Sequence, residues 1–324
     1  MTEMTAHVRV ENLRKTYQTR QDEIEAIHEV KMDVAEGEFI SILGPSGCGK
    51  STLLMIVGGL LPLTSGTVSV GGEDVSKPRR DTGVVFQAPV LMPWRTILKN
   101  VLFPIESLGL REEDYIDRAY ELLEMTGLSN FAQNVPSELS GGMQQRVAIC
   151  RALIHNPNLL LMDEPFSALD PLIRRQLQSE FMKLAKTMNK TTVFITHDLD
   201  EAVRIGHRIA IMRDGRMVQI GTAEDIVMNP ADEYVADFVS GISRFKVIRA
   251  NAIMVDVQTY EQENGAIPKE IKTFNEAEKL GSILKYAADT NKIIGIIDDN
   301  EHLIGIIDRS LLLKEIIEGA SEDE

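Results

Sequence analysis

The sequence has few cysteines, few aromatic residues and no apolar run long enough to span a membrane. Its 324 residues include two cysteines, and 5% are aromatic. Cys48 and Cys150 form no metal-binding or redox pair by their spacing, which favours a reducing compartment. The longest apolar stretch, residues 53–63, is interrupted by two glycines and a proline. It is well short of the ~20 residues that a membrane helix needs, so work at a membrane would require a partner.

Positive charge is also scarce. Lys and Arg number 34 against 49 Asp and Glu, for a net charge of −15. Such a chain is a poor ligand for nucleic acid or for anionic lipid, since both need a basic surface. We therefore expect no nucleic-acid partner. The polar start, residues 1–5, predicts no signal peptide. The length and an ordinary hydrophobic content of 44% predict a globular protein of two domains.

The most informative stretch is a glycine-rich loop between an expected strand, residues 38–43, and an expected helix, residues 53–57. It fits the pattern G-x-x-x-x-G-K-[ST] in the context that this motif requires. The loop residues are Gly44, Pro45, Ser46, Gly47, Cys48, Gly49, Lys50, Ser51 and Thr52. Glycines allow successive backbone N–H groups to surround phosphate oxygens at the positive end of the helix. Lys50 would reach the β- and γ-phosphates and Ser51 would bind Mg²⁺. The alternative, a glycine-rich turn with a chance lysine, does not explain this context.

Two apolar strands are expected to carry polar groups to the same place. Residues 159–162 form an uninterrupted apolar run that ends at Asp163 and Glu164, as in a central parallel strand. Asp163 would hold Mg²⁺, and Glu164 would orient and deprotonate the attacking water. Residues 192–196 repeat this plan and end at His197. A charged strand end facing solvent is the alternative, which the neighbouring phosphate loop disfavours.

A second glycine-rich helix start lies at Leu139–Arg146, where Ser140 precedes Gly141 and Gly142. It predicts another anion-binding helix end, unless it is an ordinary helix start. One nucleotide does not need two such sites in one subunit, which suggests that the second serves a neighbouring subunit.

The order of the remaining patterns predicts the domain organisation. Residues 7–36 alternate apolar and polar, which predicts an antiparallel β-layer, and residues 88–156 predict an inserted helical subdomain. Residues 209–220 predict a hairpin with an Asp-Gly turn. We place a domain boundary near Gly241, with domains at 1–240 and 241–324. In the second, a repeated Gly-Ile-Ile-Asp pattern over 294–308 predicts two strands after one helix and before another.

These motifs, in this order, resemble the ATP-binding-cassette (ABC) ATPases over about residues 7–240. The resemblance implies an α/β P-loop NTPase fold with an antiparallel β-layer and an inserted helical subdomain. It implies ATP and Mg²⁺ as ligands, and a head-to-tail homodimer with two ATP molecules between the phosphate loop of one subunit and the LSGG motif of the other. Met143 stands where many members of the family have a glutamine, and the glutamine of this chain follows one place later as Gln144. We expect little effect on phosphate binding, because the serine and the glycines make those contacts.

The resemblance also implies roles for single residues. Tyr17 would stack on adenine, although a simple strand-end tyrosine is the alternative. Gln87 would contact Mg²⁺ and water and sense the membrane partner, and His197 would hold the γ-phosphate. Ser140 and Gly142 would contact the γ-phosphate of the other subunit, and Ser167–Asp170 would couple the two sites.

A cassette without a membrane span resembles an importer subunit, which implies membrane permease subunits and, indirectly, a solute-binding protein as partners. Its place would be peripheral, at the cytoplasmic face of the inner membrane. Residues 87–96 resemble the nitrate, sulfonate and taurine branch, in which this region receives a permease helix near Trp94. An ordinary buried tryptophan is the alternative. A soluble ABC protein of DNA repair is disfavoured, because such members insert long coiled coils, whereas only 51 residues separate Gln87 from Leu139. Members that act in translation usually carry two cassettes, and the acidic charge disfavours both classes.

The tail resembles a single cystathionine-β-synthase (CBS) module of α+β fold over about residues 265–318. Asp308 and Leu311 occupy the positions where adenosine-binding members commonly have Thr and Asp, so nucleotide sensing is in doubt. A ligand sensor and a dimerisation clamp both remain open for this tail. A protein that acts mainly as a regulator, with ATP turnover secondary, is disfavoured as the whole function by the full catalytic set, although such regulation can be added to transport. Such modules also occur on osmoprotectant importers, which keeps glycine betaine-like solutes as an alternative substrate class.

Overall fold

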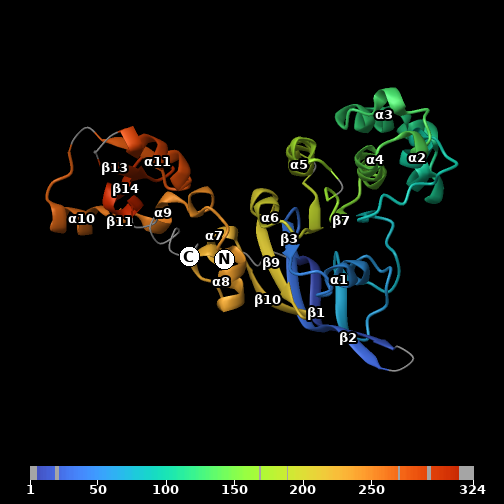
Figure 1. The fold of residues 1–324 in the computed structure, drawn as a ribbon, viewed down its shortest axis with the longest axis horizontal. Helices are drawn as coiled ribbons and strands as arrows, with labels where there is room; N and C mark the ends of the chain where they lie inside the picture. The colour runs from blue at the N-terminus through green and yellow to red at the C-terminus, as the bar shows by residue number, and fades with distance from the viewer. Residues whose placement is uncertain are drawn as a thin grey trace. The chain divides into compact units, whose positions relative to one another are not determined.

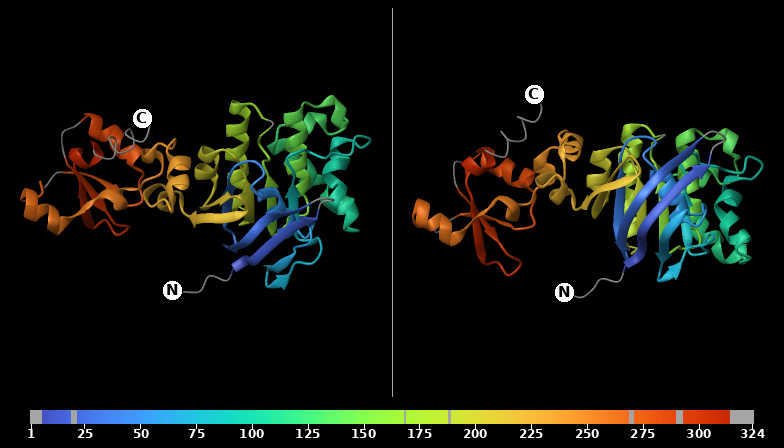
Figure 2. Two further views of the ribbon diagram at one scale, coloured as in Figure 1. Left: turned by 60° about the horizontal axis from the view of Figure 1, so that its bottom comes forward. Right: turned by 90° about the horizontal axis from the view of Figure 1, so that it is seen from below.

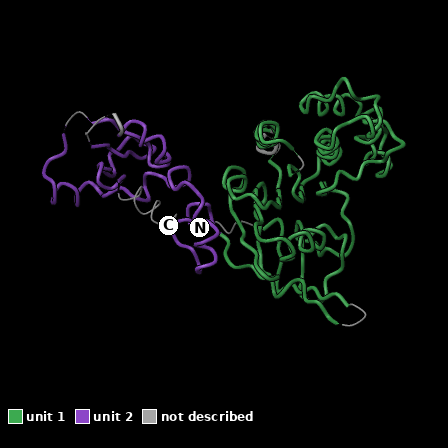
Figure 3. Tube along the Cα trace, viewed as in Figure 1, with its two compact units in different colours: residues 1–220 green, residues 221–324 purple. Residues whose placement is uncertain are grey.

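The protein divides into two compact units, Met1–Ile220 and Gly221–Glu324, which are described separately (Figure 3). The computed structural model describes residues 6–18, 22–167, 169–187, 189–268, 271–289 and 293–313. The second unit starts before the boundary predicted near Gly241. The reason is that helix α7 (Ala223–Met228) belongs to it: Met228 packs against its core, and Glu224 accepts a hydrogen bond of 2.8 Å from the Arg249 backbone.

The first unit begins with the predicted antiparallel layer. Strands β1 (Ala6–Gln18) and β2 (Glu23–Ala35) pair antiparallel along most of their length, and β4 (Ser65–Val70) and β5 (Glu73–Asp74) complete a sheet in the order β2-β1-β4-β5 (Figures 1 and 2). Alternate side chains of β1 are buried, which explains the apolar–polar alternation of its sequence.

A second sheet forms the centre of this unit in the order β10-β9-β3-β8-β7-β6. Its strands are β3 (Phe39–Leu43), β6 (Thr82–Val85), β7 (Leu159–Asp163), β8 (Thr191–Ile195), β9 (Arg208–Arg213) and β10 (Arg216–Gly221). The pairs β9–β3, β3–β8, β8–β7 and β7–β6 are parallel. Every residue of β3, β7 and β8 is buried, as expected for parallel strands covered on both faces. Asp214 and Gly215 connect β9 to β10 with φ of 48° and 73°, which fits the predicted hairpin turn.

Two hydrophobic cores cover the two faces of this sheet. Ile40 and Ile42 point into one core, which also contains the antiparallel layer and helix α1 (Lys50–Val57). Phe39 points into the other, which contains the helical subdomain and α5 (Pro171–Thr187). The sheet therefore fixes the strand ends between two packed layers.

The helical subdomain occupies the predicted segment (Figure 1). Its α-helices are α2 (Ile97–Ser107), α3 (Ile116–Met125) and α4 (Gly141–Leu153), joined by short 3₁₀ turns at Glu112–Tyr115, Ser129–Phe131 and Pro136–Glu138. Helix α2 begins only at Ile97, because Thr96 caps it by accepting a hydrogen bond from the Lys99 backbone. Within the described residues, none of the helices has both the length and the apolar character to cross a bilayer.

Four phenylalanines pack the central sheet against α5, and a substitution among them tests this packing. Phe194 in β8 lies 5.6 Å from Phe39 and 5.9 Å from Phe166 between ring centroids, and Phe166 lies 6.2 Å from Phe181. Phe194→Ala is expected to lower the free energy of unfolding by about 3–5 kcal/mol, because a fully buried ring leaves a cavity. Chemical denaturation of the first unit measures this, with Phe194→Leu as the milder control. A loss below about 1 kcal/mol would contradict the packing.

The second unit contains a four-stranded sheet in the order β11-β14-β13-β12. Its strands are β11 (Val255–Asp256), β12 (Lys272–Asn275), β13 (Ile294–Ile297) and β14 (Leu303–Ile307). Its α-helices are α7, α8 (Glu233–Val239), α9 (Ala250–Ile253), α10 (Val257–Asn264) and α11 (Leu280–Asp289). A 3₁₀ turn lies at Arg244–Lys246. The repeated sequence forms the antiparallel hairpin β13–β14, as predicted. Residues 309–313 are helical. The rest of the helix predicted there, through Ile316 and Ile317, lies outside the described residues.

Candidate functional site

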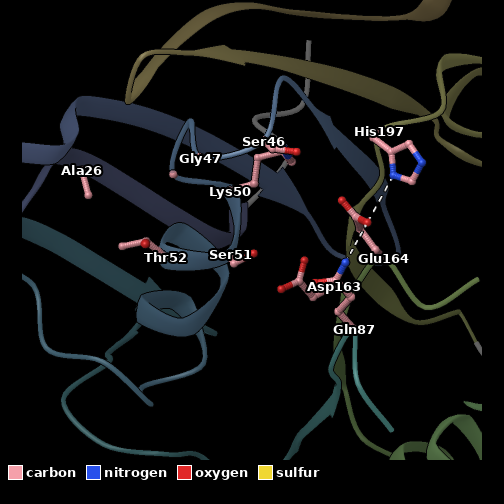
Figure 4. A pocket seen from close by; sticks show the side chains of 11 residues that line it. Ala26, Ser46, Gly47, Lys50, Ser51, Thr52, Gln87, Asp163, Glu164 and His197 are labelled. Atoms are coloured by element: carbon pink, nitrogen blue, oxygen red, sulfur yellow. Dashed lines mark hydrogen bonds and ion pairs between the residues drawn. The ribbon is translucent and has the colours of Figure 1, made fainter. Parts of the chain in front are cut away.

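A cavity of about 430 Å³ lies where the carboxyl ends of the central strands face the start of α1 (Figure 4). Its lining residues are Ala26, Ser46, Gly47, Gly49, Lys50, Ser51, Thr52, Gln87, Asp163, Glu164 and His197. The structure thus brings the phosphate loop together with Gln87 and with both predicted strand ends. Ala26 was not predicted. It lies in β2, far from the motifs in sequence, and no local pattern marks it.

Two loop glycines are required by close contacts with neighbouring backbone. A Cβ at Gly44 would lie 2.1 Å from the Met212 carbonyl oxygen. Gly49 has φ of 102°, and a Cβ there would lie 2.5 Å from the Ala26 carbonyl oxygen. Any side chain at either position would clash with backbone that cannot move aside. The loop can therefore follow this path only with glycine at both positions.

Lys50 is the cation of the cavity and is held by the loop itself. Only 6% of it is exposed. Its Nζ donates to the carbonyl oxygens of Gly44, at 2.7 Å, and Pro45, at 2.9 Å. Cys48, whose Sγ lies 4.0 Å from the same Nζ, is buried, and burial raises the pKa of its thiol more than Lys50 lowers it. Cys48 is thus a buried neutral thiol, as a small residue in a tight loop would be.

Asp163 ends β7 as a buried carboxylate beside the loop. Burial raises its pKa, and a hydrogen bond from the Ser51 hydroxyl opposes this rise. The oxygen donors of Asp163, Ser51 and Gln87 suit a hard cation such as Mg²⁺, which commonly takes one or two protein oxygens together with phosphate oxygens. The residues predicted to hold Mg²⁺ therefore line the same cavity, and their donor set fits that ion.

Glu164 lies between Gln87 and His197 (Figure 4). One oxygen of its carboxylate, Oε2, accepts from Gln87 Nε2 at 3.2 Å and lies 3.2 Å from His197 Nδ1. Its backbone has φ of 44°, a left-handed conformation that is strained for a residue with a side chain. The Glu164 N–H donates to the Ile195 carbonyl at 3.0 Å, which helps to hold this conformation. Three predicted side chains thus meet at one carboxylate oxygen.

Tyr17 lies beside the cavity rather than in its lining. Its hydroxyl is 3.4 Å from the Thr52 hydroxyl, and the Lys15 ammonium lies 5.1 Å from the centroid of its ring. The Lys15 Nζ also donates to the Pro62 carbonyl at 2.7 Å, which fixes that cation. The ring is therefore positioned next to the loop, and its role in stacking on adenine stays a prediction.

The other predicted contacts of ATP do not line this cavity. Ser140 caps α4 by accepting from the Met143 backbone at 3.3 Å, and Gly141 and Gly142 form the first turn of that helix. Asp170 accepts from the Leu172 and Ile173 backbones at 3.2 and 3.1 Å at the start of α5. In the predicted coupling loop, Ala168 lies outside the described residues.

A second hollow, of about 490 Å³, lies between the central sheet and the helical subdomain. Its lining combines apolar side chains with four basic ones, which are Arg79, Arg80, Arg151 and His155. Arg151 donates to the carbonyl oxygens of Pro89 and Val90 at 2.8 and 2.7 Å and so shapes the adjoining loop. In the same segment Trp94 is 77% exposed, so the alternative of an ordinary buried tryptophan is wrong.

Comparison with known proteins identifies the relatives of this chain. Residues 27–167 match the family model described as "ABC transporter". The glycine betaine transport ATP-binding protein OpuAA of Bacillus subtilis is 42% identical over 84% of this chain and 66% of its own length. The trimethylamine N-oxide transport system ATP-binding protein TmoW of Pelagibacter ubique is 40% identical over 85% of this chain and 84% of its own length.

A solved structure shares the fold of the first unit. The ATP-binding cassette MJ0796, in a dimeric post-hydrolysis state bound to ADP and Pi, is 38% identical. The match has a TM-score of 0.62 and covers 66% of this chain and 98% of that one. The predicted cassette fold, with its β-layer and helical subdomain, is thereby confirmed, whereas a CBS fold for the tail stays a prediction.

Proposed function

Because the chain belongs to the ABC transporter family and is an ABC ATPase, we propose that it is the energy-coupling subunit of an importer for small, fully methylated amines. The observation that carries the energy-coupling part of this proposal is the convergence of Lys50, Asp163, Glu164, Gln87 and His197 on one cavity. Each of these groups has a distinct task in the transfer of a phosphoryl group to water.

The side chains of the cavity divide the chemistry between them. The Lys50 ammonium would bind the β- and γ-phosphates, exchanging two loop carbonyls for phosphate oxygens. The Glu164 carboxylate would accept a proton from the attacking water. His197 would meet the γ-phosphate through its other ring nitrogen, because its Nδ1 already faces Glu164. Bound Mg²⁺, held by Ser51, Asp163 and Gln87, would neutralise phosphate charge.

We infer that two copies of the chain form a head-to-tail dimer. Ser140, Gly141 and Gly142 form a helix start of the type that binds anions, yet they do not line the cavity of their own subunit. Their placement supports a role at the ATP of a second copy. The dimeric state of the related cassette agrees with this proposal.

The hollow beside the helical subdomain fits a permease. Its apolar lining, which includes Phe86, Met92 and Phe103, suits the apolar face of a helix. Exposed Val90 belongs to this lining, and exposed Trp94 follows it in the same segment. A permease docked here would hold the chain at the cytoplasmic face of the inner membrane and receive solute from a binding protein.

We propose the solute class from the relatives. It replaces the nitrate, sulfonate and taurine class that the sequence of residues 87–96 predicted. The two relatives described above are named for glycine betaine and trimethylamine N-oxide, which share a trimethylated nitrogen. The nitrate, sulfonate and taurine class rested on residues 87–96, which by the proposed docking would face the permease rather than the solute. The osmoprotectant alternative is therefore the better supported of the two.

The second unit is proposed as a regulatory or dimerisation domain. Asp308 accepts from the Leu311 backbone at 2.9 Å and so caps the helical residues 309–313. Leu311 packs against the core of the unit. An apolar, packed side chain at this position favours a dimerisation clamp over an adenosine sensor.

Reconstitution tests the proposed function. The tagged chain, with the permease that co-purifies with it and the matching binding protein, is placed in liposomes. We expect glycine betaine or trimethylamine N-oxide to raise ATP hydrolysis and to accumulate inside. Taurine and nitrate serve as controls. Stimulation by taurine or nitrate alone would overturn the solute class, and ATP hydrolysis that no permease affects would overturn the transport role.

A further inference from the structure

A buried carboxylate lies outside the cavity but close to one of its walls. Glu201 is in the first turn of α6 (Leu199–Ile205), directly after the loop that carries His197, and only 8% of it is exposed. Burial raises the pKa of its carboxyl, and hydrogen bonds from Thr196 and Gln178 oppose that rise. A charge placed in such a site costs free energy unless its oxygens are satisfied, so its contacts are informative.

The first set of contacts is a closed ring of hydrogen bonds among Thr196, Asp198 and Glu201, which includes both sequence neighbours of His197. The Thr196 hydroxyl donates to Oε2 of Glu201. The Asp198 N–H donates to that hydroxyl at 3.0 Å, and the Glu201 N–H donates to the Asp198 carboxylate at 3.0 Å. The residues immediately before and after His197 are thus both tied to Glu201. The backbone that carries the histidine is fixed on both sides.

The second set of contacts ties the same loop to α5. The other carboxylate oxygen of Glu201, Oε1, accepts from Gln178 Nε2 at 2.5 Å, and Gln178 is itself buried. One turn earlier in α5, Arg174 donates to the carbonyls of Ser167 and Leu169 at 3.3 and 3.1 Å. Its Nη1 lies 3.9 Å from the Asp198 carboxylate. Helix α5 therefore holds both the loop at Ser167–Asp170 and the loop at His197.

The side chain of His197 needs this support. It is 59% exposed, and its ion-pair contact is with Glu164 (Figure 4). An exposed imidazole has few neighbours to fix its rotamer, so the position of its backbone decides where its nitrogens lie. A displacement of about 1 Å at a reacting group can lower a rate by about 10²-fold.

We propose that Glu201 is a positioning residue, which holds the backbone of residues 196–198 so that His197 reaches Glu164 and the γ-phosphate. The proposal rests on the proposed ATPase site and deepens it, because Glu201 itself does not line the cavity. It makes the hydrogen-bond ring, rather than the imidazole alone, responsible for sensing the γ-phosphate.

A purely structural role for Glu201 predicts different behaviour. If Glu201 only joins α6 to α5, its loss lowers stability and weakens ADP and ATP alike. If Glu201 acts through His197, its loss lowers kcat and the preference for a γ-phosphate, while the affinity for ADP is kept. The ratio of the two affinities separates the two roles.

The experiment uses the full-length chain and four variants. Glu201→Ala and Glu201→Gln are made in the wild type, and Glu201→Ala is also made with His197→Ala, which is studied alone as well. Steady-state ATP hydrolysis gives kcat, and titration gives the affinities for MgADP and for the Mg²⁺ complex of AMP-PNP. We expect Glu201→Ala to lower kcat by about tenfold to hundredfold and to lower the AMP-PNP preference, with unchanged ADP affinity.

The other variants are expected to behave differently. Glu201→Gln should keep most of the activity. Its amide oxygen can accept from Thr196, and its NH₂ group can donate to the Gln178 oxygen once the Gln178 amide has flipped by 180°. In the His197→Ala background, Glu201→Ala should leave the affinity ratio unchanged. Equal weakening of ADP and AMP-PNP, a wild-type kcat for Glu201→Ala, or the same effect in both backgrounds would overturn the proposal.

A second variant covers a failure of Glu201→Ala to fold. Thr196→Val keeps the shape of the side chain but removes the hydroxyl that joins Glu201 to Asp198, and Thr196→Ser restores it. We expect the loss with valine and recovery with serine, and equal activity of the two overturns the proposal. The wild type measured beside them reports on the proposed function, because that function fails if the wild type itself does not hydrolyse ATP.

Discussion

Replacing Glu164 by glutamine is expected to lower kcat for ATP hydrolysis by about 10²- to 10⁴-fold, the contribution of a positioned general base. The amide keeps the size of the side chain and can still bond to Gln87 and His197, but it cannot accept a proton from water. ATP should therefore still bind, and the ATP-bound dimer should accumulate. Phosphate release measures the first effect, and light scattering during gel filtration with ATP measures the second.

The matched control is Glu36→Gln, the same chemical change at an exposed carboxylate outside the cavity lining. It should leave both measurements at their wild-type values. A Glu164→Gln protein with wild-type turnover would show that another group takes the proton. A variant that no longer binds ATP would mean that Glu164 holds the cavity together.

The Lys50→Met substitution is expected to raise the Kd for MgATP by about tenfold to hundredfold. Hydrogen bonds to charged groups contribute about 1.5–3 kcal/mol each, and every 1.4 kcal/mol corresponds to about tenfold in affinity. The methionine fills the space of the buried stem but leaves the carbonyls of Gly44 and Pro45 without their donor. Isothermal titration of the Glu164→Gln background with MgATP measures binding without turnover.

The control for Lys50 is Lys31→Met, at an exposed position of β2. It removes the same charge from the molecule but should leave the Kd unchanged. If Lys50→Met binds MgATP as tightly as its parent, the loop N–H groups alone hold the phosphates, and the lysine is structural.

Local patterns were enough to predict most of the cavity. The phosphate loop is a run of adjacent residues, so its conformation follows from its own glycines. Asp163 ends β7 and Glu164 follows it, whereas His197 comes two residues after the end of β8. Strands β7 and β8 are parallel neighbours, and the carboxyl ends of parallel strands meet at one edge. Their proximity therefore followed from strand order alone, as did the buried runs that carry them.

Contacts between distant elements could not be predicted in this way. Gln178 and Glu201 are 23 residues apart and lie on different helices, so no spacing rule relates them. Ala26 enters the cavity because β2 passes behind Gly49. The boundary near Gly241 was placed by a change of composition, whereas the packing of Met228 decides to which unit α7 belongs.

The solute class was the least predictable feature. Residues 87–96 were assigned to one transporter branch because of their local sequence. Trp94 and Val90 are exposed in this segment, and nothing in their surroundings distinguishes one solute from another. Under the proposed function, this segment would be selected for the surface of a permease rather than for the solute. Identity over most of the chain is a broader comparison, and it supported the alternative class.

The exposure of Trp94 makes the protein its own optical probe. The chain contains a single tryptophan, so its indole fluorescence arises from one point, two residues along the chain from Met92, which lines the second hollow. An indole in water emits at long wavelength and is open to collisional quenchers, and both properties change when an apolar surface covers it. Binding at this hollow can thus be followed by the emission of the unmodified protein, without an attached dye.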